Sequence, residues 1–334
     1  MGLLIGLGGV GNAGGGGGVV AGGLIQDMEG AACVAKITNT NITEFSGADC
    51  MYVNSFEEMF NRCSSLVSVG ELKNTMKVTS AYMMFNECEN LQSVHLFNTS
   101  NVTNMSNMFS YCSALQTVPS FDTSSVTDMS FMFNNCDKLQ AVPLLDTANV
   151  TDMRNMFYYC LVLQTVPAFD TSSVTSMSGM FSYCKALQTV QAFDTSNVTN
   201  MYGIFHECIA LQSVPALDTA KVTNMSYMFR GCKSLHTIGD IDMIKVTSDS
   251  NANYMLSFCT ALVTANIANL GVSLDLSWCK VLSIDSVLYL FNNAQSGVSG
   301  KTIQLNSLVF AQLTEDQIAI ATEKGFSVTS VVRS

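Results

Sequence analysis

The sequence predicts an α/β repeat solenoid in which each 24-residue unit contributes one helix and one short strand to a parallel sheet. Three observations support this: a Val-Thr pair that recurs every 24 residues, a cysteine that recurs at the same interval, and an apolar pattern that keeps its register between them. The Val-Thr pairs begin at residues 78, 102, 126, 150, 174, 198, 222 and 246. The cysteines at this interval are Cys88, Cys112, Cys136, Cys160, Cys184, Cys208 and Cys232. Because a fixed period of this length is typical of stacked repeats, we expect one array with a continuous core.

The segment between the Val-Thr pair and the cysteine is expected to form the helix. In a representative unit, Met129, Met132, Phe133 and Cys136 fall at positions i, i+3, i+4 and i+7. This spacing places them on one face of a helix of about three turns. Thr127 is expected to cap the helix, because its hydroxyl can accept a hydrogen bond from an unpaired backbone N–H.

The segment after the cysteine is expected to form the strand. Leu139, Val142 and Leu145 are its apolar residues, and the stretch is too short for a helix. Strands of successive units would form a parallel ladder with a spacing of about 4.8 Å. The four prolines of the chain share one position in this segment: Pro119, Pro143, Pro167 and Pro215.

Composition excludes several classes of function. The formal net charge is −11 and the 15 basic residues are scattered, which argues against binding to nucleic acid or to anionic membranes. The twelve cysteines include no CxxC pair and only three histidines accompany them, so neither a metal site nor another cofactor site is expected. The same three histidines give no basis for a Ser-His-Asp or Cys-His catalytic pair. We therefore expect a protein that is not an enzyme.

The repeated pattern Val-Thr-x-Met-x-x-Met-Phe-x-x-Cys-x-x-Leu resembles the BspA-like leucine-rich repeat. This family includes bacterial surface proteins, mycoplasma lipoproteins and some phage tail or virion proteins, and the resemblance extends over about residues 50–282. It implies a leucine-rich-repeat-like solenoid with a surface or adhesive role. It provides no catalytic residues that could be transferred to this chain.

Four segments are predicted: a glycine-rich N-terminal arm (1–30), an N-terminal cap (31–50), the BspA-like repeat solenoid (51–282) and a C-terminal cap (283–334). The arm contains a GxGxxG sequence at Gly6, Gly8 and Gly11. Five further glycines follow where a dinucleotide site needs a helix, so this sequence is not interpreted as a cofactor site. The arm also lacks the basic region and compact apolar stretch of a secretory signal.

The C-terminal cap is expected to contain two helices and a last strand. Residues 283–294 have a helical apolar pattern. Thr314 and Gln317 form a capping-box pattern for a helix that runs to about Lys324, and Gly325 can end it in a left-handed conformation. The strand is expected at 326–332.

Recognition would be encoded at positions that vary while the repeat holds. Between the phenylalanine and the cysteine of each unit lie two such positions, which include His206-Glu207 and Arg230-Gly231. Because tyrosine is a common interface anchor, the predicted partner-binding residues are Tyr111, Tyr158, Tyr159 and Tyr183. The alternative is that these rings only cover the helix surface.

Two polar rows accompany the repeat. The acidic row is Asp122, Asp146, Asp170, Asp194 and Asp218. It is interpreted as turn capping, with a calcium ladder as the less favoured alternative. The glutamine row is Gln92, Gln116, Gln140, Gln164, Gln188 and Gln212. It is interpreted as a ladder of amide hydrogen bonds, with a carbohydrate-binding surface as the alternative.

Together these patterns predict a non-enzymatic recognition or structural protein that binds a protein or carbohydrate ligand on a surface. The glycine-rich arm and the many thiols favour a phage virion component, a tail or head fibre, whose arm docks onto virion structural proteins. The alternative is a bacterial cell-surface adhesin. Neither a membrane span nor a nucleic-acid partner is expected.

Overall fold

The computed structural model describes residues 18–20 and 41–333. The chain divides into two compact units, Met1–Asp170 and Thr171–Ser334, which are taken in turn below. The predicted arm lies outside the described residues except for three of them, and its GxGxxG sequence lies outside entirely.

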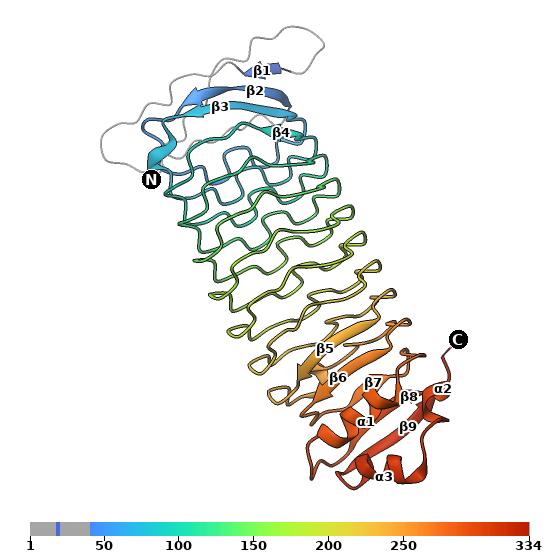
Figure 1. Cartoon of the computed structure of the whole chain (residues 1–334). Coiled ribbons are helices and arrows are strands. Elements are labelled where there is room, and N and C mark those ends of the chain that lie inside the picture. The colour runs from blue at the N-terminus through green and yellow to red at the C-terminus, as the bar shows by residue number, and fades with distance from the viewer. Residues whose placement is uncertain (1–17, 21–40, 334) are drawn as a thin grey trace. The chain divides into compact units, whose positions relative to one another are not determined.

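The first unit begins with a four-stranded parallel sheet in the order β1-β2-β3-β4 (Figure 1). The strands are β1 (Gly18–Val20), β2 (Ile42–Asp49), β3 (Ser68–Lys73) and β4 (Ser93–Val94). Phe45 pairs with Val69, and Val69 pairs with Val94, so each strand lies beside the equivalent residues of the next unit. The parallel arrangement predicted from the repeat is therefore confirmed in this sheet. A short 3-10 helix, η1 (Thr75–Lys77), follows β3.

Beyond β4, isolated parallel β-bridges join the successive turns in place of continuous strands. Asn104 bridges to Ser80 on one side and to Asp128 on the other, and Asp128 bridges in turn to Asp152. The expected strand at Leu139–Leu145 does not form, although backbone hydrogen bonds still join the turns there. Proline lacks the N–H that a ladder needs, which disfavours a strand in units that carry it.

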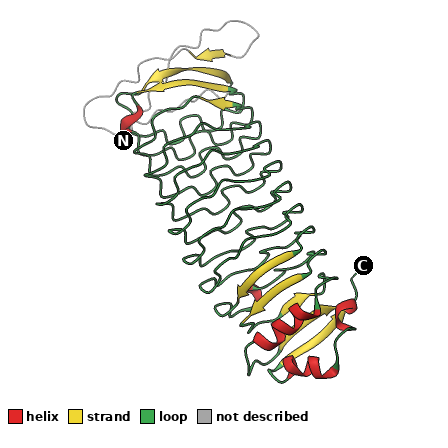
Figure 2. Cartoon of the chain, in the orientation of Figure 1, coloured by secondary structure: helices red, strands yellow, loops and turns green. Residues whose placement is uncertain are grey.

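The helix predicted in each unit is wrong, because the segment folds as consecutive turns (Figure 2). Met108 N–H donates to the Met105 carbonyl at 3.2 Å, and Cys112 N–H donates to the Phe109 carbonyl at 3.1 Å. These bonds span three residues rather than the four of an α-helix. Tyr111 has φ 60°, a left-handed conformation that an α-helix excludes and that the third residue of a type II turn requires.

The remaining backbone groups of this segment bond to the next turn of the stack. Asn107 N–H donates to the Ser130 carbonyl at 2.9 Å, and Tyr111 N–H donates to the Asn134 carbonyl at 2.7 Å. Thr127 is likewise not a helix cap, since its N–H and its hydroxyl both donate to the Thr103 carbonyl, at 2.9 and 3.2 Å. Hydrogen bonds between turns thus replace those that a helix would form along its axis.

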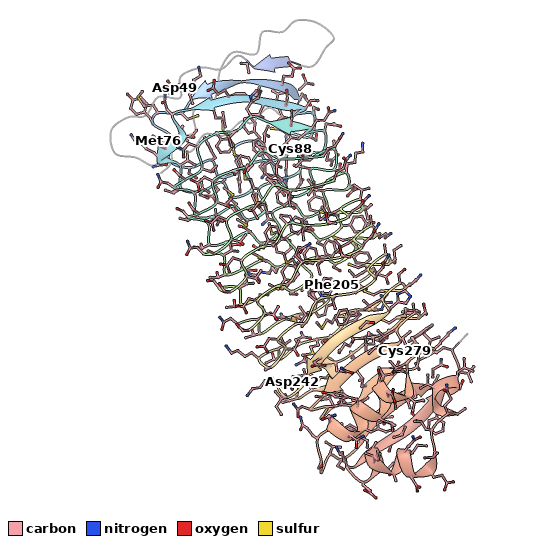
Figure 3. The ribbon with its side chains drawn as sticks, in the orientation of Figure 1. Asp49, Met76, Cys88, Phe205, Asp242 and Cys279 are labelled. Atoms are coloured by element: carbon pink, nitrogen blue, oxygen red, sulfur yellow. The ribbon has the colours of Figure 1, made fainter. Side chains whose placement is uncertain are left out.

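The core of the first unit is a set of identical side chains stacked from turn to turn (Figure 3). Phe109 stacks on Phe85 and on Phe133, with ring centroids 5.3 and 5.8 Å apart. The Cys88 thiol is fully buried and donates to the Phe60 carbonyl at 3.1 Å. Burial raises the pKa of the Cys63 thiol to about 11. The interpretation of the cysteines as a buried repeat position is confirmed.

The second unit repeats this stack and then changes to regular strands. Phe205 stacks on Phe181 and on Phe229, with ring centroids 5.8 and 5.7 Å apart. The strand β5 pairs in parallel with β6, and a three-stranded parallel sheet follows in the order β7-β8-β9. The elements are β5 (Thr237–Asp242), the 3-10 helix η2 (Asp249–Asn251), β6 (Thr264–Ala268), β7 (Leu274–Leu276), β8 (Lys301–Asn306) and β9 (Phe326–Val331).

The predicted elements of the C-terminal cap are confirmed. Its helices are α1 (Ile284–Asn293), α2 (Ser307–Phe310) and α3 (Glu315–Thr322), of which α2 was not expected. The capping box of α3 is present, and Gly325 has φ 100° just after the helix. Along the described residues, no helix has the length and apolarity needed to cross a bilayer.

Candidate recognition surface

The left-handed turns determine which side chains reach the surface. In the regular units, the residues one and five positions before the cysteine have positive φ, as in Asn107 and Tyr111 before Cys112. The methionine, phenylalanine and cysteine of the same segment are fully buried. The residue just before the cysteine can therefore reach solvent, as Tyr111 does at 49% exposure, whereas its neighbour Ser110 is buried.

The four predicted tyrosines do not form one group within either unit. In the first unit the rings of Tyr158 and Tyr159 stack, with centroids 6.2 Å apart. Tyr111 is 49% exposed and has no ring contact among the described residues. Tyr183 belongs to the second unit, where its ring meets the edge of the His206 ring at 4.9 Å. Their role as partner-binding residues stays a prediction.

The second unit contains a larger set of surface residues, seven with aromatic rings and two arginines, which we call the aromatic strip. It consists of Tyr183, Tyr202, His206, Tyr227, Arg230, Tyr254, Phe258, Trp278 and Arg333. Tyr227 is central, with its ring 5.4 Å from Tyr202, 5.2 Å from Tyr254 and 5.6 Å from His206. Each ring therefore supports its neighbour from the adjacent turn.

Two arginines continue the aromatic strip toward the C-terminal cap. The guanidinium of Arg230 lies 5.9 Å from the Tyr227 ring and 5.3 Å from the Phe258 ring. Phe258 is 3.9 Å from Trp278, and Arg333 lies 4.9 Å from the Trp278 ring. Such cation–π contacts hold the arginine planes against the rings, while their N–H groups bond to neighbouring side chains, as Arg333 Nε does to Ser277 Oγ at 2.9 Å.

A polar cluster stabilises the middle of the aromatic strip. Arg230 Nη1 donates to His206 Nε2 at 2.8 Å and to Glu207 Oε1 at 3.2 Å. Burial, followed by the positive charge of Arg230, holds the pKa of His206 below its ordinary value, with Glu207 opposing the shift. His206 is thus neutral at pH 7 and accepts from Arg230. A Cβ at Gly231 would lie 2.6 Å from the Glu207 carboxyl group, so glycine makes room for the cluster.

This cluster contains no activated nucleophile. Cys208 follows Glu207 in sequence, but its side chain is fully buried in the core. Burial first, then the neighbouring Cys184, raises its pKa well above the ordinary value. Catalysis by cysteine needs the thiolate, which this environment suppresses. Cys208 is therefore part of the core and not of the polar cluster.

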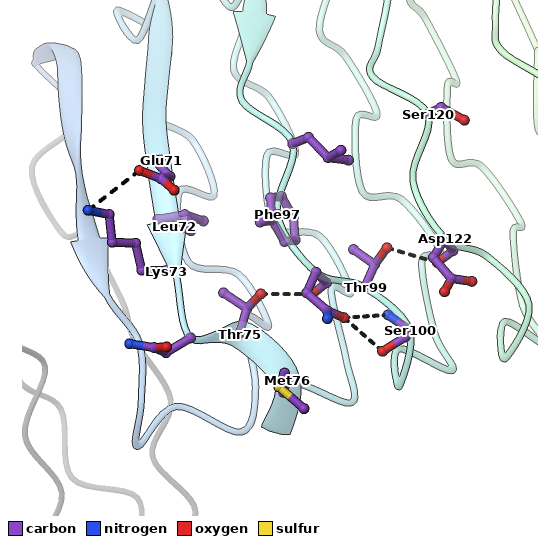
Figure 4. A pocket seen from close by; sticks show the side chains of 13 residues that line it. Glu71, Leu72, Lys73, Thr75, Met76, Phe97, Thr99, Ser100, Ser120 and Asp122 are labelled. Atoms are coloured by element: carbon purple, nitrogen blue, oxygen red, sulfur yellow. Dashed lines mark hydrogen bonds and ion pairs between the residues drawn. The ribbon is translucent and has the colours of Figure 1, made fainter.

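A second candidate surface lies in the first unit, where an open groove of about 710 Å³ follows β3 (Figure 4). Met76 and Leu96 are 66% and 56% exposed at its rim. Two of its polar side chains are already paired: the Thr75 hydroxyl donates to the Asn98 carbonyl, and Asn98 Oδ1 accepts from Ser100. These groups therefore serve the local backbone of the groove.

The acidic row caps turns, as interpreted from the sequence. Asp122 Oδ1 accepts from the Ser124 hydroxyl at 2.7 Å and from its N–H at 3.1 Å, and these two bonds lower the pKa of Asp122. Asp146 accepts in the same way from the Ala148 N–H. Across the described residues, no group of three or more His, Cys, Asp and Glu side chains is arranged to hold a metal ion.

The glutamine row does not form the expected amide ladder in the described part of the first unit. Between Gln116 and Gln140 the hydrogen bond joins backbone groups, the Gln140 N–H and the Gln116 carbonyl, at 3.0 Å. The side chains of Gln92, Gln116 and Gln140 are exposed, and none bonds another. The extended segment is held by its backbone, which leaves these amides in solvent.

Most of the aromatic strip was missed by the sequence prediction. His206 and Arg230 stand at variable positions of the repeat, but the sequence prediction includes only tyrosines between the phenylalanine and the cysteine. Tyr202, Tyr227 and Tyr254 lie instead before the phenylalanine position, at successive intervals of 25 and 27 residues rather than 24. A search for aromatic residues that recur slightly out of register would have found them.

The stacked turns define the chain as a parallel repeat solenoid. It belongs to the family described as "Mycoplasma protein of unknown function, DUF285", whose sequence profile matches in overlapping segments: 26–143, 54–166, 79–189, 140–237, 161–270 and 184–296. No curated protein matches the chain significantly. The more specific likeness to BspA-like repeats remains a resemblance.

Several solved structures are similar. A leucine-rich repeat protein from Eubacterium ventriosum shares 17% identity with a TM-score of 0.45, and the match covers 91% of this chain and 90% of that one. A leucine-rich repeat protein from T. pallidum shares 20% identity with a TM-score of 0.32, over 65% of this chain and 82% of that one. The functional domain of InlJ from Listeria monocytogenes, described as including a cysteine ladder, shares 13% identity with a TM-score of 0.30, over 82% and 59%.

Proposed function

We propose that this chain is a non-enzymatic recognition protein that binds a partner through the aromatic strip of its second unit. The observation that carries the proposal is the unbroken series of ring contacts from Tyr202 through Tyr227 to Tyr254. Rings that are already held in place lose little conformational freedom when a partner covers them. Tyrosine, tryptophan and arginine are also the residues most enriched among binding hot spots.

The exposed part of the aromatic strip is large enough to matter energetically. Tyr202 and Tyr254 are 43% and 51% exposed. An aromatic side chain buries about 150–250 Å² when fully covered, so each ring has roughly 100 Å² left to bury. At about 25 cal/mol per Å², covering one ring contributes about 2.5 kcal/mol, the size of a binding hot spot.

A binding array tests this function with the full chain. The array carries bacterial envelope polysaccharides, mucins and extracellular-matrix proteins, and the labelled probes are the wild type, the Tyr227→Ala/Tyr254→Ala double variant and Tyr111→Ala. Tyr111→Ala is the matched control, because it removes an exposed tyrosine outside the aromatic strip. We expect the double variant to lose the spots that both other proteins retain. Equal retention by all three, or no retention by the wild type, contradicts the proposal.

We further propose that the protein serves as a phage virion component, a tail or head fibre that binds a host surface or partner protein. The thiols packed through the core support assembly in a reducing cytoplasm. The glycine-rich residues 1–30 would dock onto virion structural proteins. A bacterial cell-surface adhesin is the alternative, and it suits the resemblance to BspA-like surface proteins.

Mass spectrometry of the native protein in its source fraction distinguishes the two settings. Co-purification with capsid or tail proteins is the result expected for a virion component. Recovery from a cell-envelope fraction without phage proteins would contradict that setting and favour the adhesin. Recognition by the aromatic strip applies in either setting, because it depends on the second unit alone.

A further inference from the structure

A small cavity opens beside the aromatic strip in the second unit. It has a volume of about 160 Å³ and lies between η2, the turn that carries Tyr254, and the strands β7 and β8. This volume is several times the roughly 30 Å³ that one water molecule occupies, and it is below the roughly 300 Å³ at which pockets for drug-sized ligands begin. The cavity is therefore of a size for one small ring.

The two carboxyl groups in the lining are each matched by a cation. Asp249 Oδ1 lies 3.0 Å from Lys301 Nζ, and Asp275 Oδ2 lies 3.5 Å from Arg333 Nη2. Asp249 also accepts from the N–H and the hydroxyl of Ser273, at 2.9 and 3.2 Å. Because the charges compensate, the cavity carries no net charge that would select an ionic ligand.

Three neutral polar side chains complete the rim. Asn253, Thr302 and Gln304 line the cavity, and among the described residues their side chains form no hydrogen bond. Thr302 and Gln304 are two positions apart on β8, so they project from the same face of the strand. Two amides and a hydroxyl provide both donors and acceptors, which matches a ligand with several hydroxyl groups.

Tyr254 also lines the cavity, beside the apolar Ala252 and Leu274; it is 51% exposed, and its ring lies 5.2 Å from that of Tyr227. Tyr254 has φ 56°, so the left-handed backbone conformation determines the direction of its Cα–Cβ bond. The electron-rich face of an aromatic ring attracts the C–H groups of an apolar ring face. A pyranose has such a face, with hydroxyl groups around its edge.

We propose that this cavity binds a single neutral sugar residue, stacked on Tyr254 and hydrogen-bonded by Asn253, Thr302 and Gln304. The inference rests on the proposed function and specifies its ligand: the aromatic strip leads into a site for one residue of a surface glycan. The rest of the glycan would extend over Tyr227 and Tyr202, whose rings continue the contact.

Saturation-transfer NMR with the full chain tests the sugar site. The probes are glucose, galactose, mannose and N-acetylglucosamine, with N-acetylneuraminic acid and glucosamine as charged controls. One neutral sugar is expected to bind with a Kd of about 1 mM, because a single ring has few atoms with which to make contacts. The charged sugars are expected to bind at least about tenfold more weakly. Absence of binding by every neutral sugar at roughly 100 mM overturns the proposal.

Variants locate the site. Gln304→Ala and Thr302→Val should each raise the Kd by about tenfold, whereas Gln140→Ala, an exposed glutamine of the first unit, should leave it unchanged. Thr302→Val keeps the side-chain shape, so it decides the outcome if Gln304→Ala fails to fold. Unchanged affinity in both folded variants overturns the proposal.

The binding array and the sugar titration test the two proposals separately, so the failure of one can be told from the failure of the other. Retention on protein spots that depends on the aromatic strip, without sugar binding, would refute the sugar site and leave recognition by the aromatic strip in place. Sugar binding that depends on Thr302 and Gln304, without any array retention that depends on Tyr227 and Tyr254, would refute the proposed function instead.

Discussion

Two substitutions at Tyr111, to alanine and to glycine, distinguish stacked turns from stacked helices. The two structures predict opposite signs for the difference in unfolding free energy between the two variants. Tyr111→Ala and Tyr111→Gly both remove a half-exposed ring without ring contacts, so they differ only in what the backbone allows. At φ 60° an L-residue carries a penalty of about 1–2 kcal/mol that glycine avoids. Glycine's greater loss of conformational freedom on folding offsets about 0.5–1 kcal/mol of this advantage. The glycine variant should therefore be more stable than the alanine variant by about 0.7 kcal/mol, the middle of a range of roughly 0–1.5 kcal/mol.

A helix predicts the opposite order. In a helix interior, glycine is about 0.8–1.0 kcal/mol less favourable than alanine. Urea unfolding followed by far-UV circular dichroism measures the difference as a shift in midpoint at constant slope. Ala114→Gly is the control, because residue 114 is not at positive φ and this change should destabilise the protein. If Tyr111→Gly were less stable than Tyr111→Ala by about 1 kcal/mol, the reasoning from the left-handed turns would be refuted.

Three further predictions concern the core. Phe133→Ala removes a fully buried ring and should lower the unfolding free energy by about 3–5 kcal/mol in urea titrations. Thr123→Val should cost about 1–2 kcal/mol in the same assay, because it removes the donor that bonds the Asp146 carbonyl at 2.8 Å. The raised pKa of Cys63, about 11 against an ordinary 9.0, predicts that its contribution to stability is full below pH 9 and is lost as the pH rises through 11.

Each of these predictions has a result that would contradict it, and Thr123→Val also has a matched control. An exposed threonine, Thr127, replaced by valine should change the unfolding free energy less than Thr123→Val does, and equal losses would contradict the role given to the buried hydroxyl. Cys63→Ala should make the fall in unfolding midpoint between pH 9 and pH 11 less steep, because it removes one of several buried thiols with raised pKa values, and an unchanged slope would contradict the contribution given to Cys63. A loss below about 1 kcal/mol in Phe133→Ala would mean that the phenylalanine stack contributes little.

Much of the fold was predictable because it follows from the 24-residue repeat of the sequence. The apolar positions of the repeat, from Val126 to Leu139, are all buried as expected, since stacking places equivalent residues against one another. The start of α3 was predictable from a local signal, the capping box at Thr314, which acts within a single turn of helix.

The conformation inside each unit was not predictable from the apolar pattern. Met129, Met132, Phe133 and Cys136 lie at helical spacing, yet two successive turns also bring all four into the core. What distinguishes the two structures is the sign of φ at Phe131 and Asn135, and neither residue type requires a positive value. The hydrogen bonds that select the turns come from the neighbouring unit, which a local pattern does not represent.

Some contacts of the aromatic strip could be predicted from the sequence repeat, whereas others depend on how the C-terminal cap folds. Arg230 and His206 are 24 residues apart, so their contact follows from the period once the turns are stacked. Trp278 and Arg333 meet only because the cap brings residue 333 back beside the end of the repeats. No spacing rule connects positions that far apart.

The affinity of Tyr227→Ala for the strongest ligand from the array is the most direct test of recognition by the aromatic strip. Tyr227 contacts Tyr202, Tyr254, His206 and Arg230, so its removal disturbs the centre of the surface while the buried core stays intact. We predict a rise in Kd of at least about 30-fold, the equivalent of a hot spot of about 2 kcal/mol, and less than about twofold for Tyr111→Ala. Equal affinities of wild type and Tyr227→Ala would contradict recognition through this surface.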